Sequence, residues 1–266
     1  MIKLTLMALL LVGMGAPALA QDKSAADGIA EYRRLLADGN PAELYEARGE
    51  ALWKRKRGPK NDSLEACDLG KGPGVIKGAF VELPRWFEDA QLVQDLETRL
   101  VWCMEKYQGL NGAEIAKTAF GRGEMANVTA LATYVATASQ GMPFRLPQRH
   151  AEERKSYEIG KRVFYFRGGT HDFSCSSCHG VDGQRIRLQE LPVLTKNPGD
   201  GVGFAAWPAY RVSNGQMWGM QLRLNDCYRQ MRFPYPGFGS EVTIAVSTYM
   251  GVNAKGAKSA VPTIKR

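Results

Sequence analysis

Two stretches of the chain share a pattern of apolar residues that predicts a helix in each. Residues 128–135 read Val-Thr-Ala-Leu-Ala-Thr-Tyr-Val, and residues 242–250 read Val-Thr-Ile-Ala-Val-Ser-Thr-Tyr-Met. A third stretch, 151–167, mixes charged and apolar residues and predicts another helix. No segment shows the sustained alternation of a half-buried strand. The sequence therefore predicts a mainly α protein whose helices are joined by long loops rich in glycine and proline, such as 196–208.

The two apolar helices belong to longer repeats. Each is preceded by the pattern Arg-Leu-x-x-Cys, at 99–103 and at 223–227, and each repeat has a cysteine further upstream. Self-similarity of this kind is typical of an internal duplication. Two prolines in 141–147 interrupt the helical pattern between the repeats. We therefore predict two domains of related fold, 21–145 and 146–266.

Residues 1–20 have the composition of a secretory signal peptide. Lys3 precedes an apolar run at 4–12, and Ala18 and Ala20 are the small residues of a cleavage site. The run is shorter than the roughly 20 apolar residues that a membrane-spanning helix needs, and no later segment approaches that length. We therefore expect an exported, periplasmic protein without a membrane span.

The formal net charge of the chain is +8. The positive charge is spread along the sequence, apart from a small cluster at Lys255, Lys258, Lys265 and Arg266. A basic surface attracts nucleic acid, anionic membranes, acidic proteins or small anions. No basic helix or interleaved aromatic platform indicates nucleic-acid binding. The export signal favours acidic proteins and small anions as partners.

The strongest chemical signal is the run Cys175-Ser176-Ser177-Cys178-His179. Two thiols at this spacing reach both vinyl groups of a haem, and the adjacent imidazole lies under the iron as proximal ligand. A redox pair or half of a zinc site is the alternative. Zinc would need two further ligands, and the only other histidines are His150 and His171. With an export signal in place, the run predicts one covalently attached haem c.

The sixth iron ligand decides between electron transfer and catalysis. Electron-carrier cytochromes c commonly use methionine at this position. Methionine is also a common core residue, so most methionines of this half are expected to serve packing alone. The candidates are His171, Cys227, Met217, Met220, Met231 and Met250.

Cys227 is expected on a helix over 216–231, which has a capping-box pattern at 213–216 and a proline beyond its end. Arg223 lies four residues earlier and therefore on the same face. A neighbouring cation lowers the pKa of a thiol and favours the thiolate, which is both nucleophile and iron ligand. The guanidinium can also hold an oxyanion through two parallel hydrogen bonds. The pair predicts a site for an anionic substrate, although a buried free cysteine, with Arg223 solvated or paired to Asp226, is equally compatible with the residues alone.

An odd count of five cysteines is informative in an oxidising compartment. In the first half, Gly70 and Lys71 follow Cys67 where a second cysteine and a histidine would complete a haem motif. Either a haem site has decayed here or Cys67 never belonged to one, and both interpretations leave this half without haem. Cys67 and Cys103 are then the natural disulfide pair, with a stabilisation of ~3 to 4 kcal/mol on the chain-entropy model. One cysteine is expected to stay unpaired.

Several motifs together point to one family. They are Cys67-Asp68-Leu69-Gly70, Glu97-Thr98-Arg99-Leu100, the CxxCH run, Trp207-Pro208-Ala209-Tyr210-Arg211, and Arg223 with Cys227. Over essentially the whole mature sequence the chain resembles SoxA, the larger cytochrome subunit of the SoxAX complex of the thiosulfate-oxidising Sox system. This family has two-haem and one-haem forms. Gly70 and Lys71 match the one-haem form, so the resemblance implies two cytochrome c-like domains, of which the first has no haem.

The resemblance implies an enzyme, an L-cysteine S-thiosulfotransferase, which oxidatively joins thiosulfate to a cysteine of the carrier protein SoxYZ. Electrons would leave through haem to a cytochrome c. Because joining two reduced sulfurs removes two electrons and one haem accepts one, we expect a heterodimer with the SoxX cytochrome subunit. Carried onto this sequence, the resemblance implies that Cys175 and Cys178 attach the haem and that His179 is the proximal ligand. Cys227 would be the distal ligand and the nucleophile, which in the family is found as a persulfide. Arg223 would bind the sulfonate.

Three other functions compete with this interpretation. A plain electron carrier would have methionine or histidine as sixth ligand. A thiosulfate dehydrogenase would join two thiosulfates into tetrathionate and need no carrier cysteine. A structural subunit with a vestigial haem would tolerate the loss of Arg223.

Overall fold

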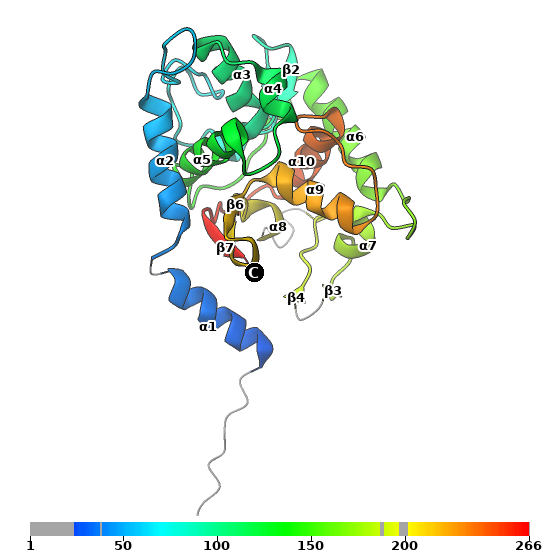
Figure 1. Ribbon diagram of the computed structural model, residues 1–266. Helices are drawn as coiled ribbons and strands as arrows, with labels where there is room; N and C mark the ends of the chain where they lie inside the picture. The colour runs from blue at the N-terminus through cyan, green and yellow to red at the C-terminus, as the bar shows by residue number, and fades with distance from the viewer. Residues whose placement is uncertain (1–23, 38, 187–188, 197–201, 266) are drawn as a thin grey trace, which may run out of the picture.

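The computed structural model describes residues 24–37, 39–186, 189–196 and 202–265. The expected signal peptide, residues 1–20, lies outside these ranges. The described part is mainly α, as the sequence predicts (Figure 1). Its helices are α1 (Ala25–Ala37), α2 (Ala42–Lys54), α3 (Leu96–Gln108), α4 (Gly112–Lys117), α5 (Gly123–Thr137), α6 (Ala151–Tyr165), α7 (Cys175–His179), α8 (Val202–Ala205), α9 (Met220–Gln230) and α10 (Glu241–Asn253), with short 3-10 turns at Phe80–Glu82 and Val212–Asn214.

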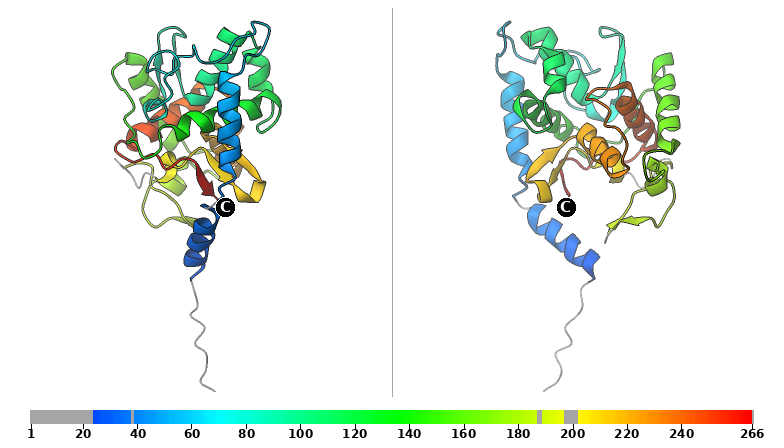
Figure 2. Two further views of the ribbon diagram at one scale, coloured as in Figure 1. Left: turned by 90° about the vertical axis from the view of Figure 1, so that its left-hand side faces the viewer. Right: turned by 45° about the vertical axis from the view of Figure 1, so that its right-hand side comes forward.

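The strands are two or three residues long, which is too short for an alternating pattern to be visible in the sequence. β1 pairs with β2 and β3 with β4 in antiparallel ladders, and β5 lies between antiparallel β6 and parallel β7. Helix α1 extends away from the rest of the chain beside β7 (Figure 2). The strands are β1 (Arg85–Phe87), β2 (Leu92–Gln94), β3 (Arg185–Ile186), β4 (Gln189–Glu190), β5 (Ala209–Arg211), β6 (Gln216–Trp218) and β7 (Thr263–Lys265).

Two helix pairs of the same construction contain the apolar stretches that the sequence singled out. α2 packs across α5, and α6 packs across α10 (Figure 1). At each crossing a glycine, Gly49 or Gly160, approaches the partner helix so closely that a Cβ would overlap the carbonyl oxygen of Ala130 or Ala245. The tyrosine of the shared Thr-Tyr pair contacts the same glycine in both cases. Only glycine allows this approach.

One hydrophobic core runs through both halves of the chain. Buried residues of α3, α5, α6, α9 and α10 belong to one connected cluster. The segment 141–147, in which the sequence predicts a domain boundary, joins α5 to α6. Its Phe144 is buried, with ring centroids 5.3 Å from Phe80 and 5.2 Å from Phe204. The connecting segment therefore contributes buried side chains, Phe144 and Leu146, to the core.

The helix that carries Arg223 and Cys227 is shorter than the sequence predicts. α9 begins at Met220 because residues 216–218 form β6 at the edge of the three-stranded sheet. The capping box predicted at 213–216 is wrong, since the N-cap of α9 is a glycine without a side-chain hydrogen bond. The prediction that both residues lie on one helix is confirmed.

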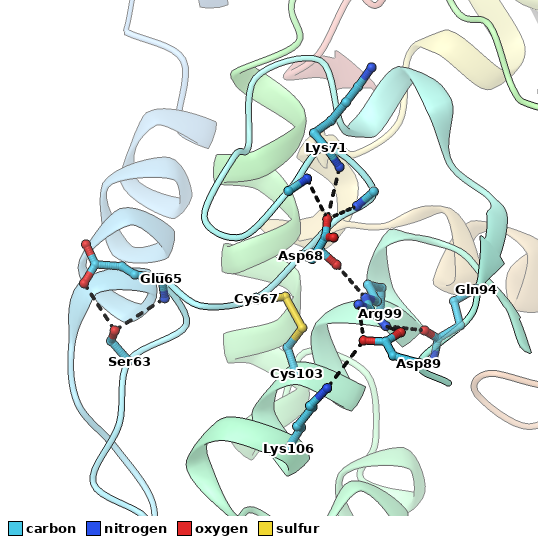
Figure 3. The surroundings of a disulfide bond; sticks show 12 residues. Ser63, Glu65, Cys67, Asp68, Lys71, Asp89, Gln94, Arg99, Cys103 and Lys106 are labelled. Carbon is cyan, nitrogen blue, oxygen red and sulfur yellow. Dashed lines mark hydrogen bonds and ion pairs between the residues drawn. A yellow bond between two sulfur atoms is a disulfide. The ribbon is translucent and has the colours of Figure 1, made fainter. Parts of the chain in front are cut away.

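A disulfide joins Cys67 to Cys103, as the sequence predicts, and ties the loop after α2 to helix α3 (Figure 3). Both cysteines are buried. Arg99, one turn before Cys103, is buried as well and donates hydrogen bonds to the Asp89 carboxylate (2.8 and 3.0 Å) and to the Asp68 carbonyl (2.8 Å). The arginine and cysteine of the first Arg-Leu-x-x-Cys pattern therefore serve structural roles.

Replacing Cys67 and Cys103 together by alanine is expected to lower the free energy of unfolding by about 3 to 4 kcal/mol. The bond links residues 36 apart, and its loss restores conformational entropy to the unfolded chain. Denaturant unfolding of the double variant beside the wild type measures the difference. A loss below about 1 kcal/mol would contradict the chain-entropy account.

Candidate functional site

A cavity of about 540 Å³ collects the residues that the sequence singled out. Cys175, Cys178 and His179 of α7 line it together with Arg223 and Cys227 of α9. Residues of helix α10 and of strands β3 and β4 line further parts of its wall. The structure therefore brings all five predicted site residues to one place.

The CxxCH run forms the single helical turn α7. Ser174 caps this turn, because its hydroxyl accepts the backbone N–H of Ser177 (3.2 Å) and the Ser177 hydroxyl accepts the backbone N–H of Ser174 (3.0 Å). Residues three apart share one face of a helix, so Cys175 and Cys178 both reach the cavity. Burial, with Cys227 close by, raises the pKa of the Cys175 thiol to about 12. This thiol is therefore neutral at physiological pH.

The ring of His179 is oriented by the backbone of the segment that follows β4. Its Nδ1 lies 2.8 Å from the carbonyl oxygen of Pro192. Because a carbonyl oxygen only accepts, Nδ1 carries the proton, and Nε2 is the ring nitrogen with a lone pair. This arrangement is typical of metal-binding histidines, whose second nitrogen donates to a backbone carbonyl or carboxylate.

Arg223 and Cys227 lie one turn apart on α9, and both face the cavity. Arg223 Nη1 donates to Asp226 Oδ2 (3.0 Å), so the pairing that the sequence left open is present. Burial raises the pKa of the Cys227 thiol, and the nearby Arg223 guanidinium offsets only part of this effect. The lowered pKa that the sequence predicts is therefore wrong in its net direction, although the influence of Arg223 has the predicted sign.

The methionines considered as sixth ligand divide into two groups. Met220, Met231 and Met250 line the cavity together with Cys227, whereas Met217 is buried on β6. His171 lies in the loop before α7, with its ring 5.7 Å from that of Phe173. The geometry thus leaves Cys227 and three methionines within the same cavity.

Among the described residues, three further cations line the cavity that were not assigned to it from the sequence, namely Arg185, Arg211 and Lys265. Arg211 of β5 and Lys265 of β7 both line it and are register partners in the parallel pair of strands. Arg211 ends the Trp-Pro-Ala-Tyr-Arg motif, and Lys265 belongs to the basic C-terminal cluster. Both residues were noted in the sequence. The pairing of β5 with β7, which brings them together, could not be predicted from it.

The lining fits a haem c. The volume lies in the range of cofactor sites, roughly 300 to 1,000 Å³, and much of the wall is apolar, with Phe164, Leu194, Leu224 and Val246. The two thiols for attachment and a histidine oriented for iron binding lie on the same wall. A CxxCH turn beside an apolar cavity of this kind defines a c-type cytochrome.

Comparisons with known proteins give the family. Residues 48–144 match the family model described as SoxA/TsdA, cytochrome c domain. The chain is 50% identical over 254 residues to the L-cysteine S-thiosulfotransferase subunit SoxA of Hydrogenophilus thermoluteolus, which covers 94% of this chain and 93% of the relative. It is 36% identical over 258 residues to a protein of the same description from Hydrogenobacter thermophilus, with 96% and 94% covered. The chain belongs to the SoxA family.

The fold is also similar to that of a solved structure. A chain described as "Crystal structure of SoxXA from P. pantotrophus" matches with a TM-score of 0.73 at 22% identity, covering 89% of this chain and 84% of that chain. At this identity the likeness concerns the fold. Within the ranges that the structure describes, none of the helices has the length and apolar character needed to cross a bilayer.

Proposed function

We propose that this chain is the SoxA subunit of an L-cysteine S-thiosulfotransferase, carries one covalent haem c, and joins thiosulfate to a cysteine of a SoxYZ-type carrier protein. The observation that carries the proposal is the shared cavity, in which the CxxCH turn, Arg223 and Cys227 come together. Relatives that are 50% and 36% identical over nearly their whole length bear the name of this activity.

Each site residue has a distinct role in this proposal. Cys175 and Cys178 would hold the haem through thioether bonds, and His179 and Cys227 would ligate its iron. When bound, the haem supplies a one-electron acceptor beside the reacting sulfur atoms. Apolar side chains such as Leu224 form part of the wall around the site.

The reaction forms one sulfur–sulfur bond between the outer sulfur of thiosulfate and the carrier thiol. It releases two electrons and the thiol proton. In this proposal the outer sulfur of thiosulfate first bonds to the Cys227 sulfur, with loss of the two electrons and the Cys227 thiol proton. The carrier thiol then attacks that outer sulfur, which breaks its bond to Cys227 and returns the Cys227 thiol. Among the described residues, Arg223 donates a hydrogen bond only to Asp226, through Nη1. Its Nε and Nη2 can therefore donate to the sulfonate oxygens.

Two electrons require two one-electron acceptors. We therefore propose that the subunit works as a heterodimer with a SoxX-type cytochrome and passes electrons to a further cytochrome c. We place the reaction in the periplasm. The signal-like residues 1–20 and the Cys67–Cys103 disulfide support this compartment, since disulfides persist where the environment is oxidising.

The two halves are, in this proposal, diverged copies of one cytochrome c unit. The glycine-mediated crossings of α2 with α5 and of α6 with α10 support a duplication. Cys103 occupies the place of Cys227 in the repeated Arg-Leu-x-x-Cys pattern. In the first half this cysteine forms the disulfide with Cys67. In this proposal a covalent crosslink has replaced a cofactor site there.

The test uses the subunit produced together with its SoxX-type partner. Thiosulfate is added with an acceptor cytochrome c and with a carrier whose reactive cysteine is intact or replaced by serine. We expect cytochrome reduction and a carrier carrying the thiosulfate group only with the intact cysteine. Tetrathionate formed without carrier would identify a thiosulfate dehydrogenase, and electron transfer without any sulfur product would leave a plain electron carrier.

A further inference from the structure

Helix α9, which presents Arg223 and Cys227 to the cavity, has no cap of its own. Its N-cap residue is Gly219, which makes no side-chain hydrogen bond. In α3 the corresponding position of the repeat, four residues before the arginine, is Asp95, whose carboxylate accepts the backbone N–H of Thr98 (2.8 Å). The first N–H groups of any helix need acceptors. Those of α9 must find theirs elsewhere.

The acceptor comes from the other half of the chain. Glu97 Oε2 accepts the backbone N–H of Gln221 (3.0 Å), 124 residues away, and the Met220 amide also stabilises this carboxylate. A Cβ at position 219 would overlap the Glu97 side chain. Position 219 is therefore a glycine because the carboxyl group of Glu97 occupies the place of a local cap.

Neighbouring contacts fix this arrangement. The Gln221 side chain donates to Asp95 Oδ2 (2.8 Å) and accepts the backbone N–H of Gly239 (2.8 Å). Asp95, Glu97 and Gln221 are all buried. Burial, with Asp95 close by, raises the pKa of Glu97 to about 8. A buried carboxyl that lost these partners would be left unsatisfied, which is costly.

The Glu97 contact lies next to the functional cavity. Glu97 and Gly219 line a small cavity of about 30 Å³. Trp207 and Met220 line both this small cavity and the large one. A change at Glu97 therefore reaches the site through a single layer of side chains and through the first turn of α9.

We propose that Glu97 is a positioning residue, which caps α9 from the half without CxxCH and thereby holds Arg223 and Cys227 in the cavity. The inference rests on the proposed function only for the roles of Arg223 and Cys227. It gives the first half a part in the reaction, namely fixing the start of the helix that carries the reacting thiol.

The test is a compensating pair of substitutions in the haem-loaded complex. Glu97→Ala is expected to weaken the low-spin thiolate signal in the electron paramagnetic resonance spectrum and to lower kcat roughly 10- to 100-fold, with a smaller change in KM. Gly219→Ser alone is expected to be harmful, because its side chain overlaps Glu97. In the double variant the serine fills the space left by Glu97 and caps α9 locally, so the signal and kcat recover.

Two control variants separate positioning from a general loss of stability. Asp89→Ala removes the carboxylate that pairs with buried Arg99 on α3, and it leaves α9 untouched. We expect it to lower the unfolding temperature and to keep the thiolate signal. Glu97→Gln keeps an oxygen that accepts the Gln221 amide, so it retains both signal and kcat.

Either of two results would overturn the proposal. The first is a thiolate signal in Glu97→Ala that is as strong as the signal in Asp89→Ala. The second is a double variant whose thiolate signal and kcat are no higher than those of Glu97→Ala. Hydrogen exchange of the Gln221 amide tests the cap independently of iron ligation, with faster exchange expected in Glu97→Ala and slow exchange again in the double variant. A wild type without a thiolate signal would count against the axial role of Cys227, and the exchange rates would still decide the role of Glu97.

Discussion

Cys227→Met is expected to abolish carrier-dependent coupling of thiosulfate, with kcat/KM reduced by at least about 1,000-fold. Methionine can bind haem iron but offers no thiol for sulfur chemistry. The haem stays attached in this variant, because the thioether cysteines on α7 are unchanged. The measurement combines the coupling assay with electron paramagnetic resonance of the oxidised protein, in which a low-spin thiolate signal of the wild type should give way to a methionine-type signal.

Met231 supplies the matched control for this experiment. It follows Cys227 by one turn and lines the same cavity. Met231→Leu keeps an apolar side chain of similar size, and we expect the thiolate signal to persist. A spectrum that changes in Met231→Leu and not in Cys227→Met would remove Cys227 from the iron and make an electron carrier the better account.

The local features of the site were predictable because each depends on residues close in the sequence. The CxxCH spacing specifies its own turn, in which Ser174 and Ser177 complete the cap. Four-residue spacing places Arg223 and Cys227 on one face of a helix. The helices at 128–135, 151–167 and 242–250 followed from their apolar patterns in the same way.

The properties that depend on burial or on pairing between separate segments of the chain were not predictable. Helical spacing places a guanidinium beside the Cys227 thiol, and only the fold reveals that burial outweighs it and raises the pKa. The start of α9 was misplaced because residues 216–218 form a strand too short to be visible in the sequence, and this strand pairs with β5 in a sheet completed by the distant β7. Glu97 was visible only as part of a family motif, since its partner Gln221 lies in the other half.

Arg223→Ala is expected to raise KM for thiosulfate about 10- to 100-fold, the range that corresponds to losing charge-assisted hydrogen bonds to an anion. Arg223→Lys keeps the charge and loses the planar fork, so its KM should lie between those of wild type and alanine variant. Steady-state rates of the complex at varied thiosulfate concentration give both values. The haem spectrum is expected to stay unchanged in both variants.

Asp226 makes a sharp control possible, because it pairs with two arginines. Arg229 Nη2 donates to Asp226 Oδ1 (2.6 Å). The Arg229 side chain is exposed and does not line the cavity. Arg229→Ala therefore disturbs the same carboxylate without removing a donor from the site, and its KM should stay close to that of wild type. Equal effects of Arg223→Ala and Arg229→Ala would mean that the Asp226 ion pairs, through the conformation of α9, matter more than a contact between Arg223 and the anion. A large effect confined to position 223 would place the sulfonate beside that guanidinium, one turn from the thiol with which thiosulfate reacts.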